Sequence, residues 1–379
     1  RKIVISTGAV TTLAGSTSYG STDATGTSAR FRYPRKITTD GTNLYVADRT
    51  NHLIRKIVIS TGAVTTLAGS TSSGSTNGTG TSARFSSPHG ITTDGTNLYV
   101  ADRGNSRIRK IVIATGVVTT FAGSTSSGST DGTGTSAKFS EPRGITTDGT
   151  NLYVADTGNH LIRKIVISTG AVTTLAGSTS SGSTNGTGTA ARFNNPKGIT
   201  TDGTNLYVSD TSNHLIRKIV ISTGVVTTLA GSSSGSTDGT GTSARFNNPP
   251  GIVSDGTKLY IADRFNHTIR KISLWGTVTT DVALRNIDDD FPTNPEVTVK
   301  GMLTNTGSFE LKDGDLNLSG GAMLGAGSID VTGSTLNLGN NLSKTGGSLA
   351  SATSSLKLSD NVSISSNDEL TFKDVDLNR

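Results

Sequence analysis

The chain has 379 residues with 34 Lys and Arg, 28 Asp and Glu, a net charge of +6 and no cysteine, which excludes disulfides and thiolate metal sites. No apolar run approaches the ~18–20 residues that a membrane-spanning helix requires. Residues 1–280 carry 27 basic and 14 acidic side chains, whereas residues 281–379 carry 7 and 14. The charge pattern therefore predicts a basic domain with an anionic partner, followed by an acidic domain.

Residues 1–280 are built from one sequence that recurs every 54 residues. Equivalent lysines mark the period, the last of them one residue early: Lys2, Lys56, Lys110, Lys164, Lys218 and Lys271. Such a period is typical of solenoids, propellers and repeat arrays. Because Arg1–Ile5 corresponds to Arg55–Ile59, the chain starts inside a repeat, and we expect any targeting sequence to lie upstream.

Each repeat is predicted to form four short strands. In the second repeat, β-branched and aromatic runs occupy residues 90–93, 97–101, 107–113 and 117–122. The dipeptides Asp94-Gly95 and Thr115-Gly116 between them favour tight turns, so the runs predict an antiparallel meander. Aliphatic side chains on both faces of the third run, such as Ile108 and Ile111, indicate that both faces of the sheet are covered.

A sheet this small buries too little apolar surface alone, so neighbouring copies must pack against it. Sheets packed face to face around an axis form a β-propeller, and an all-β propeller of about six blades is the predicted fold of residues 1–284. The first blade is expected to be incomplete, because the chain has six copies of the third and fourth strands and five of the first and second. An open β-solenoid is the alternative, and it fits two-residue hairpins less well.

The repeat resembles the NHL family in the three residues that name it. They stand in phase with the strands at Asn51-His52-Leu53, Asn159-His160-Leu161 and Asn213-His214-Leu215, with altered versions at Asn105-Ser106-Arg107 and Asn266-His267-Thr268. The segments ARFNNP and YVAD also resemble bacterial members of the family. The resemblance covers roughly residues 1–280 and implies a propeller, commonly six-bladed, that serves as a binding platform.

A polar connection such as residues 69–85 follows each fourth strand, and its Gly, Ser and Thr content predicts a flexible linker. Near its end stands a phenylalanine that we expect to be buried against the next blade: Phe31, Phe85, Phe139, Phe193 or Phe246. A basic residue precedes each of them. Arg84, for example, either pairs with Asp102 at the end of the second strand or is solvated while Asp102 caps its own turn.

The repeats differ mainly just before the first strand and at the turn after the second. In an up-and-down blade both places lie at the same end, so we expect their side chains to gather on one face. The predicted ligand-binding residues are Arg32, Arg35, Arg49, His89, Arg103, Arg143, Lys197 and Arg264, with Glu141 as the single acidic residue among them. This charge favours a polyanionic polysaccharide or a protein ligand. Drift at tolerant loop positions is the alternative explanation.

No catalytic residue, metal ligand or cofactor is predicted. Four histidines recur at one position of successive blades, too far apart to share an ion, and we expect them to be structural: His52, His160, His214 and His267. The G-x-G-x-x-A segments, such as residues 78–83, lack the βαβ context of a nucleotide-binding turn. Only Tyr33 and Phe265 are aromatic residues interleaved with the basic set, which does not favour nucleic acid.

An acidic, proline-bearing linker is predicted at residues 285–296, before short alternating runs such as Leu316-Asn317-Leu318. These runs resemble the parallel β-helix stalks of bacterial surface adhesins, so residues 297–379 are predicted to be a β-solenoid-like segment. We expect the native chain to continue beyond Arg379. The sequence as a whole predicts a non-enzymatic binding scaffold, secreted by a bacterium or attached to its surface. The alternative is a propeller-type lyase or hydrolase that acts on an extracellular polymer.

Overall fold

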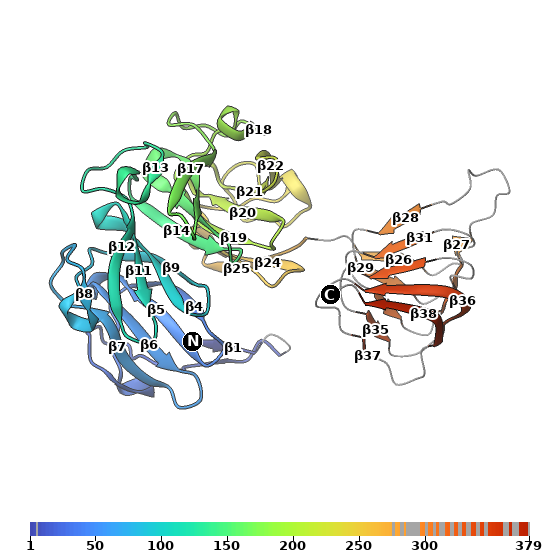
Figure 1. The fold of residues 1–379 in the computed structure, drawn as a ribbon, viewed down its shortest axis with the longest axis horizontal. Coiled ribbons are helices and arrows are strands. Elements are labelled where there is room, and N and C mark those ends of the chain that lie inside the picture. The colour runs from blue at the N-terminus through green and yellow to red at the C-terminus, as the bar shows by residue number, and fades with distance from the viewer. Residues whose placement is uncertain are drawn as a thin grey trace. The chain divides into compact units, whose positions relative to one another are not determined.

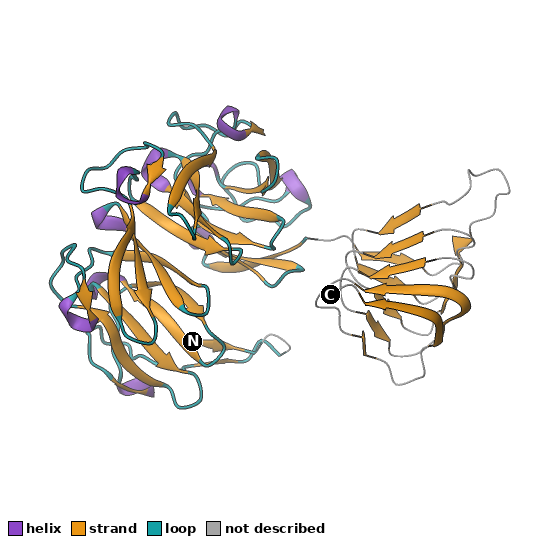
Figure 2. Cartoon of the chain, in the orientation of Figure 1, coloured by secondary structure: helices purple, strands orange, loops and turns teal. Residues whose placement is uncertain are grey.

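The structure, a computed structural model, describes residues 1–4 and 7–274, and between residues 277 and 377 it describes the backbone of strands. Along residues 24–273, four five-stranded sheets and one three-stranded sheet follow one another as the blades of a propeller (Figure 1). The described residues contain no α-helix, and their helical turns are short 3-10 segments (Figure 2). The predicted all-β propeller is therefore confirmed.

Each blade runs from an inner first strand outwards. The first strands are β4 (Pro34–Thr39), β9 (Pro88–Thr93), β14 (Pro142–Thr147), β19 (Pro196–Thr201) and β23 (Gly251–Ser254). The second strands are β5 (Asn43–Asp48), β10 (Asn97–Asp102), β15 (Asn151–Asp156), β20 (Asn205–Asp210) and β24 (Lys258–Asp263). The third strands are β6 (Leu53–Val58), β11 (Arg107–Val112), β16 (Leu161–Val166), β21 (Leu215–Val220) and β25 (Thr268–Ser273).

The outer strands complete four of the blades. The fourth strands are β7 (Ala63–Gly69), β12 (Val117–Ala122), β17 (Ala171–Ala176) and β22 (Val225–Ala230). A fifth, two-residue strand from the preceding connection adds to each outer edge: β3 (Ala24–Thr25), β8 (Gly78–Thr79), β13 (Gly132–Thr133) and β18 (Gly186–Thr187). The connection that the sequence predicted as a flexible linker therefore holds a strand, and that part of the prediction is wrong.

The ladders are antiparallel, with the predicted strands and turns. In the second blade β10 pairs with β9 and with β11, and the carboxylate of Asp94 accepts the backbone N–H groups of Thr96 and Asn97 at 2.9 and 2.6 Å. The Tyr99 hydroxyl donates to the same carboxylate at 3.0 Å. Gly95 has a φ of 90°, which glycine adopts without a steric penalty. The DGTN turn is thus fully used for structure.

The apolar core lies between blades. Ile54 and Ala68 of the first blade pack in one cluster with Phe85 and Ile91 of the second, and the same cluster recurs between the next two pairs of blades. The predicted burial of the loop phenylalanines is confirmed for Phe85, Phe139, Phe193 and Phe246, while Phe31 is half-buried. Each buried ring is worth about 1.5–3 kcal/mol of transfer free energy.

A fully buried arginine in the third strand fastens the connection to the blade. The guanidinium of Arg109 lies 5.2 Å from the centroid of the Phe85 ring and donates to the Asp102 carboxylate at 3.1 Å and to the carbonyls of Arg84 and Thr76 at 2.9 and 3.1 Å. Asp102 also accepts the N–H of Ser86 at 2.7 Å. The ion pair considered between Arg84 and Asp102 is therefore wrong, and the aspartate caps the start of its own blade.

The structure shows five blades, and the two ends of their arc are open. Ile37 of the first blade is 49% exposed and Ile269 of the fifth is 68% exposed, whereas their equivalents Ile91 and Ile108 are 1% and 0% exposed. The Lys36 ammonium donates to the Ile252 carbonyl at 3.4 Å and so links the first and last inner strands. A small sheet of β1 (Lys2–Ile3) and β2 (Val10–Thr11) precedes the first blade.

A second unit comprises residues 257–259 and 272–379. Its strands are β26 (Thr277–Thr280), β27 (Leu284–Arg285), β28 (Glu296–Val299), β29 (Met302–Asn305), β30 (Ser308–Glu310), β31 (Asp315–Leu318), β32 (Ala322–Leu324), β33 (Ser328–Asp330), β34 (Thr335–Leu338), β35 (Leu342–Lys344), β36 (Ser348–Leu358), β37 (Ile364–Ser365) and β38 (Thr371–Leu377). They pair in parallel, as β31 does with β34. Most of the predicted linker, residues 286–295, lies outside the described residues.

Candidate ligand-binding cavity

The turn after each second strand contains the NHL residues or their equivalents. It also fixes the position of the variable residue that precedes them. In the first blade β5 ends at Asp48, and the 3-10 turn η2 (Arg49–Asn51) follows. Asn51 donates to the Asp48 carboxylate at 2.7 Å and to the Gly20 carbonyl at 2.6 Å. His52 closes the turn in the left-handed conformation, with a φ of 60°. These contacts fix the backbone on either side of Arg49.

The histidines of the motif join neighbouring blades. The Nδ1 atoms of His52, His160 and His214 accept the backbone N–H of Ser87, Asn195 and Asn248 at 3.0, 3.1 and 3.0 Å. A nitrogen that accepts a hydrogen bond is unprotonated, so each ring is neutral in this arrangement. No group of three or more potential metal-ligating side chains occurs in the described part of the chain.

The second, third and fourth inner strands approach their neighbours closely at the glycine that follows the variable residue near the start of the strand, where the first blade has Lys36. A Cβ added to Gly90 would lie 2.2 Å from the carbonyl oxygen of Arg143 in the next blade, and one added to Gly144 would lie 2.2 Å from that of Lys197. Glycine is required there because the backbones touch. The side chains that precede these glycines are therefore held where the inner strands meet.

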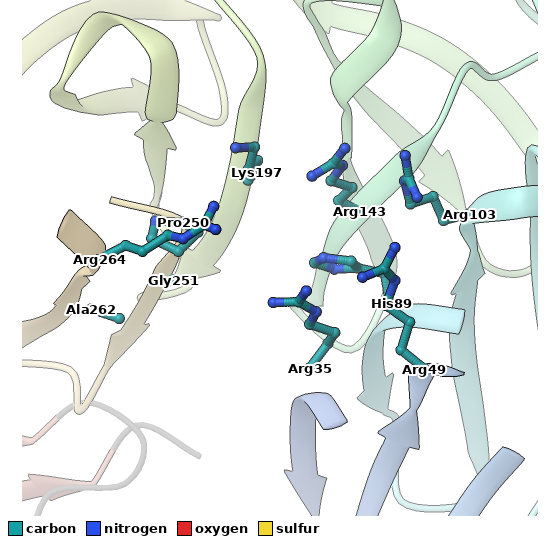
Figure 3. A pocket seen from close by; sticks show the side chains of 10 residues that line it. All are labelled: Arg35, Arg49, His89, Arg103, Arg143, Lys197, Pro250, Gly251, Ala262 and Arg264. Atoms are coloured by element: carbon teal, nitrogen blue, oxygen red, sulfur yellow. The ribbon is translucent and has the colours of Figure 1, made fainter. Parts of the chain in front are cut away.

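A single cavity of about 260 Å³ lies where the five inner strands meet. Figure 3 shows the basic side chains around it, drawn from all of the blades. The cavity is lined by Arg35, Arg49, His89, Arg103, Arg143, Lys197, Pro250, Gly251, Ala262 and Arg264. The structure thus brings together seven of the eight residues that the sequence singled out. Arg32 lies elsewhere, with its guanidinium 5.1 Å from the centroid of the Tyr19 ring.

The cavity carries more positive charge than the chain neutralises. Glu141 accepts from Arg103 at 2.6 Å and from Arg143 at 3.1 Å. Among the described residues, the other cationic side chains of the lining have no acidic partner: Arg35, Arg49, Lys197 and Arg264. An anion that entered would therefore meet unpaired cations in a partly desolvated site, where charge–charge attraction is strong.

Burial and the nearby cations shift the pKa values of the side chains that line the cavity. Burial, with the nearby arginines, lowers the pKa of Lys197 to about 8 and that of His89 to about 3, so the imidazole is neutral at pH 7. Burial and Arg49 also lower the pKa of Arg35. The hydrogen bond from Arg103 lowers the pKa of Glu141, which keeps that carboxylate ionised.

Sequence reasoning missed two features of the site. It noted Glu141 as a lone acidic residue but did not predict that two arginines hold it. It also missed Thr157 and Thr211, which stand where other blades have arginine and donate from their buried hydroxyls to the carbonyls of Pro196 and Pro249 at 2.7 and 2.9 Å. The signal was present, since each residue departs from the repeat at a variable position.

Comparison with known proteins supports an NHL β-propeller. The NHL repeat family matches residues 85–111. The chain is 29% identical over 298 residues to NHL repeat-containing protein 2 of Homo sapiens, which covers 67% of this chain and 41% of that protein. It is also 29% identical over 305 residues to Protein SUPPRESSOR OF QUENCHING 1, chloroplastic, of Arabidopsis thaliana, over 73% of this chain and 29% of that protein. The chain thus spans less than half the length of these relatives.

Solved structures similar to the chain include a structural genomics protein of unknown function from Bacteroides thetaiotaomicron, with a TM-score of 0.44 and 25% identity over 69% of this chain and 75% of that one. An auxiliary nutrient binding protein from the same organism has a TM-score of 0.45 and 20% identity over the same shares. Within the described part of the chain, no helix is long and apolar enough to cross a membrane.

Proposed function

We propose that the protein is a non-enzymatic binding scaffold whose cavity captures a polyanionic ligand, an acidic polysaccharide or an acidic protein partner. The observation that carries the proposal is the group of four cationic side chains in one cavity with no acidic partner among the described residues. The same face varies between repeats, while the Asp-Gly-Thr and Thr-Gly turns on the opposite face recur with few changes. Seven of the variable residues gather in one cationic cavity, which supports ligand recognition there.

Binding is favoured over turnover by the composition of the lining. A lyase or hydrolase needs a general acid and a general base with pKa values near the working pH. Lys197, with a pKa of about 8, has the pKa of one such group, but the lining offers it no second. His89 is neutral and resists protonation, since its pKa is about 3, and the carboxylate of Glu141 is held by two arginines. Incubation with acidic polysaccharides therefore should generate no new reducing ends. Turnover that Arg49→Glu abolishes would establish the enzyme instead.

The test of capture uses charge reversal inside and outside the cavity. The variant Arg49→Glu/Arg264→Glu should lose binding to an acidic glycan array, and wild-type binding should fall steeply between 50 and 500 mM salt, because screening acts over about 8–10 Å near physiological ionic strength. The matched control Arg84→Glu/Arg192→Glu changes the net charge equally at exposed loop positions and should bind as wild type does. Binding that ignores both salt and the cavity variant would refute the proposal.

The proposal extends to the setting and to the rest of the chain. A chain without cysteine and rich in Gly, Ser and Thr supports a secreted or surface-attached bacterial protein. Parallel pairing of residues 20 apart, as in Leu316 with Leu336 and Leu336 with Leu356, supports a partial parallel β-helix after the propeller. The identity of Arg1–Gly15 with Arg55–Gly69, together with the open ends of the arc, supports a ring of six blades.

A further inference from the structure

The cavity already contains one carboxylate, and its surroundings show how the ring holds such a group. The two oxygens of Glu141 accept from guanidinium groups of two adjacent blades, Arg103 after β10 and Arg143 on β14, at 2.6 and 3.1 Å. Charge-assisted pairs of this kind are roughly twice as strong as neutral hydrogen bonds. Glu141 stands in the turn just before its inner strand, with a φ of 49°.

The same arrangement exists one blade earlier without the carboxylate. Counting back 54 residues, Arg103 becomes Arg49, Arg143 becomes His89, and Glu141 becomes Ser87. The backbone is equivalent, because Ser87 has a φ of 51°. A serine hydroxyl ends too close to the backbone to replace a glutamate carboxylate. Arg49 consequently has no acidic partner among the described residues.

Other groups around this position favour an anion. Arg35 enters the cavity from the first inner strand, and Figure 3 shows it beside Arg49 and His89. Burial, and then Arg143, Arg35, Arg103 and Arg49, lower the pKa of His89, so its imidazole is neutral and keeps one N–H. The Nε atom of Arg49 is buried and has no hydrogen-bond partner. A carboxylate placed here would meet two guanidinium groups and an imidazole N–H.

We propose that the cavity binds a carboxylate group of the ligand at Arg49, Arg35 and His89, in the position that Glu141 occupies one blade further on. The inference rests on the proposed function and adds the chemical class. The cavity of about 260 Å³ is smaller than the roughly 300–1,000 Å³ of sites for drug-sized ligands, so it takes one acidic sugar unit and not a longer segment of chain. Uronic acids have this chemistry.

The repeat itself supplies two variants with opposite expected effects. Ser87→Glu places an internal carboxylate at the empty position, in a backbone conformation that already accepts glutamate at residue 141, and should weaken the binding of D-glucuronate at least tenfold. Glu141→Ser removes the internal carboxylate and frees Arg103 and Arg143, so glucuronate should bind at least threefold more tightly or with a second equivalent. Titration calorimetry measures both, with glucose as the uncharged control.

The outcomes separate this inference from the proposed function. If Arg49→Glu/Arg264→Glu abolishes capture of acidic glycans but Ser87→Glu leaves glucuronate affinity unchanged, the carboxylate position is wrong while anion capture stands. If wild type binds no acidic glycan at any salt concentration, the proposed function fails. Inorganic sulfate that binds as tightly as glucuronate, with the same loss in Ser87→Glu, would overturn the carboxylate class.

Thermal unfolding tests whether Ser87→Glu loses glucuronate binding only because the variant misfolds. Ser87→Glu should unfold at or above the wild-type temperature, because the new carboxylate relieves repulsion among cations and the backbone N–H of Ser87 keeps its bond to His52. The glucuronate affinity of Glu141→Ser is a second, independent test, since a gain of affinity cannot result from misfolding. A Glu141→Ser protein that is folded and binds glucuronate as wild type does would contradict the inference.

Discussion

Replacing Arg109 with methionine tests how much the buried arginine of each blade contributes to stability. Arg109 and Asp102 are both 0% exposed in their side chains and lie 3.1 Å apart. Methionine retains an unbranched aliphatic stem but removes the guanidinium that lies over the Phe85 ring. It leaves Asp102 buried with Ser86 and Asn105 as its remaining hydrogen-bond donors. Removing one partner of a buried ion pair costs about 3–5 kcal/mol, so we expect the free energy of unfolding to fall by that amount at pH 7.5.

The pH dependence of this loss follows from the aspartate. Burial raises the pKa of Asp102 to about 6 even with Arg109 present, against the lowering effect of its hydrogen bonds and of Arg109. Without the arginine the carboxyl takes up a proton more readily, and a neutral Asp102 needs no cationic partner. The difference between wild type and Arg109→Met should therefore be smaller at pH 5 than at pH 7.5. For the same reason, Asp102→Asn/Arg109→Met should be more stable than Arg109→Met at pH 7.5.

Urea unfolding followed by circular dichroism measures these differences, with the slope of the transition checked for each variant. Arg84→Met is the matched control, because it removes an exposed arginine, and it should change the free energy of unfolding by less than about 0.5 kcal/mol. A loss below about 1 kcal/mol for Arg109→Met at pH 7.5, or a double variant less stable than the single one, would refute the reasoning.

Two further predictions concern pH. Lys197, with a pKa of about 8, loses its charge between pH 7 and 9, so affinity for an acidic ligand should fall over that range in wild type and stay level in Lys197→Arg; a level wild-type profile would contradict this. Burial lowers the pKa of His52 and of His160, so their contribution to stability is present above the unfolded value of about 6.5 and is lost as the pH falls below it. His52→Asn/His160→Asn should therefore be less stable than wild type by about 1 kcal/mol per bond at pH 8. This difference in the free energy of unfolding should disappear by pH 5. A difference that stays constant would show that the bonds to Ser87 and Asn195 do not depend on the neutral ring.

The strands were predictable from sequence because their signals are local. Alternating β-branched residues between Asp-Gly and Thr-Gly turns gave the strands around Asp94 to within two residues, and period alone implied that blades pack on one another. The pairing of Asp102 was not predictable. Arg84 and Arg109 are both candidate partners of Asp102 by their positions in the repeat. Only the register of β11 against β10 shows that Arg109 points into the blade.

The candidate site was predictable as a set of positions but not as an arrangement. Deviation from the repeat identified Arg35, Arg49 and Arg143, since topology places both variable positions at one end of the blade. Which cations are paired depends on distances between blades, which no single repeat encodes. Glu141 neutralises Arg103 across a blade boundary, and Arg32, which belongs to the same variable set, turns away towards Tyr19.

The position directly after the second strand has one of two roles in each blade. The residue after the second strand is threonine in the third and fourth blades, where the Thr157 and Thr211 hydroxyls are buried and donate to a carbonyl of the next blade. In the first, second and fifth blades an arginine stands there, and Arg49, Arg103 and Arg264 all line the cavity. Where threonine stands at this position, the blade gains a hydrogen bond to the next blade. Where arginine stands there, the blade places a positive charge in the cavity.

Within each repeat, one set of residues maintains the fold and a different set lines the cavity. The network of Asp102, Asn105 and Arg109 and the buried phenylalanine core recur in the second, third and fourth blades, so they maintain the propeller whichever residue follows the second strand. The clusters between blades contain none of the arginines or the lysine of the cavity, so these residues can vary without altering the cores. Among the described residues, the four lining cations without an acidic partner lie on the first, fourth and fifth blades, whereas Glu141 pairs with Arg103 and Arg143 of the second and third. This unequal distribution gives a nearly repetitive propeller one cationic side, and an asymmetric acidic ligand can be held there in one orientation.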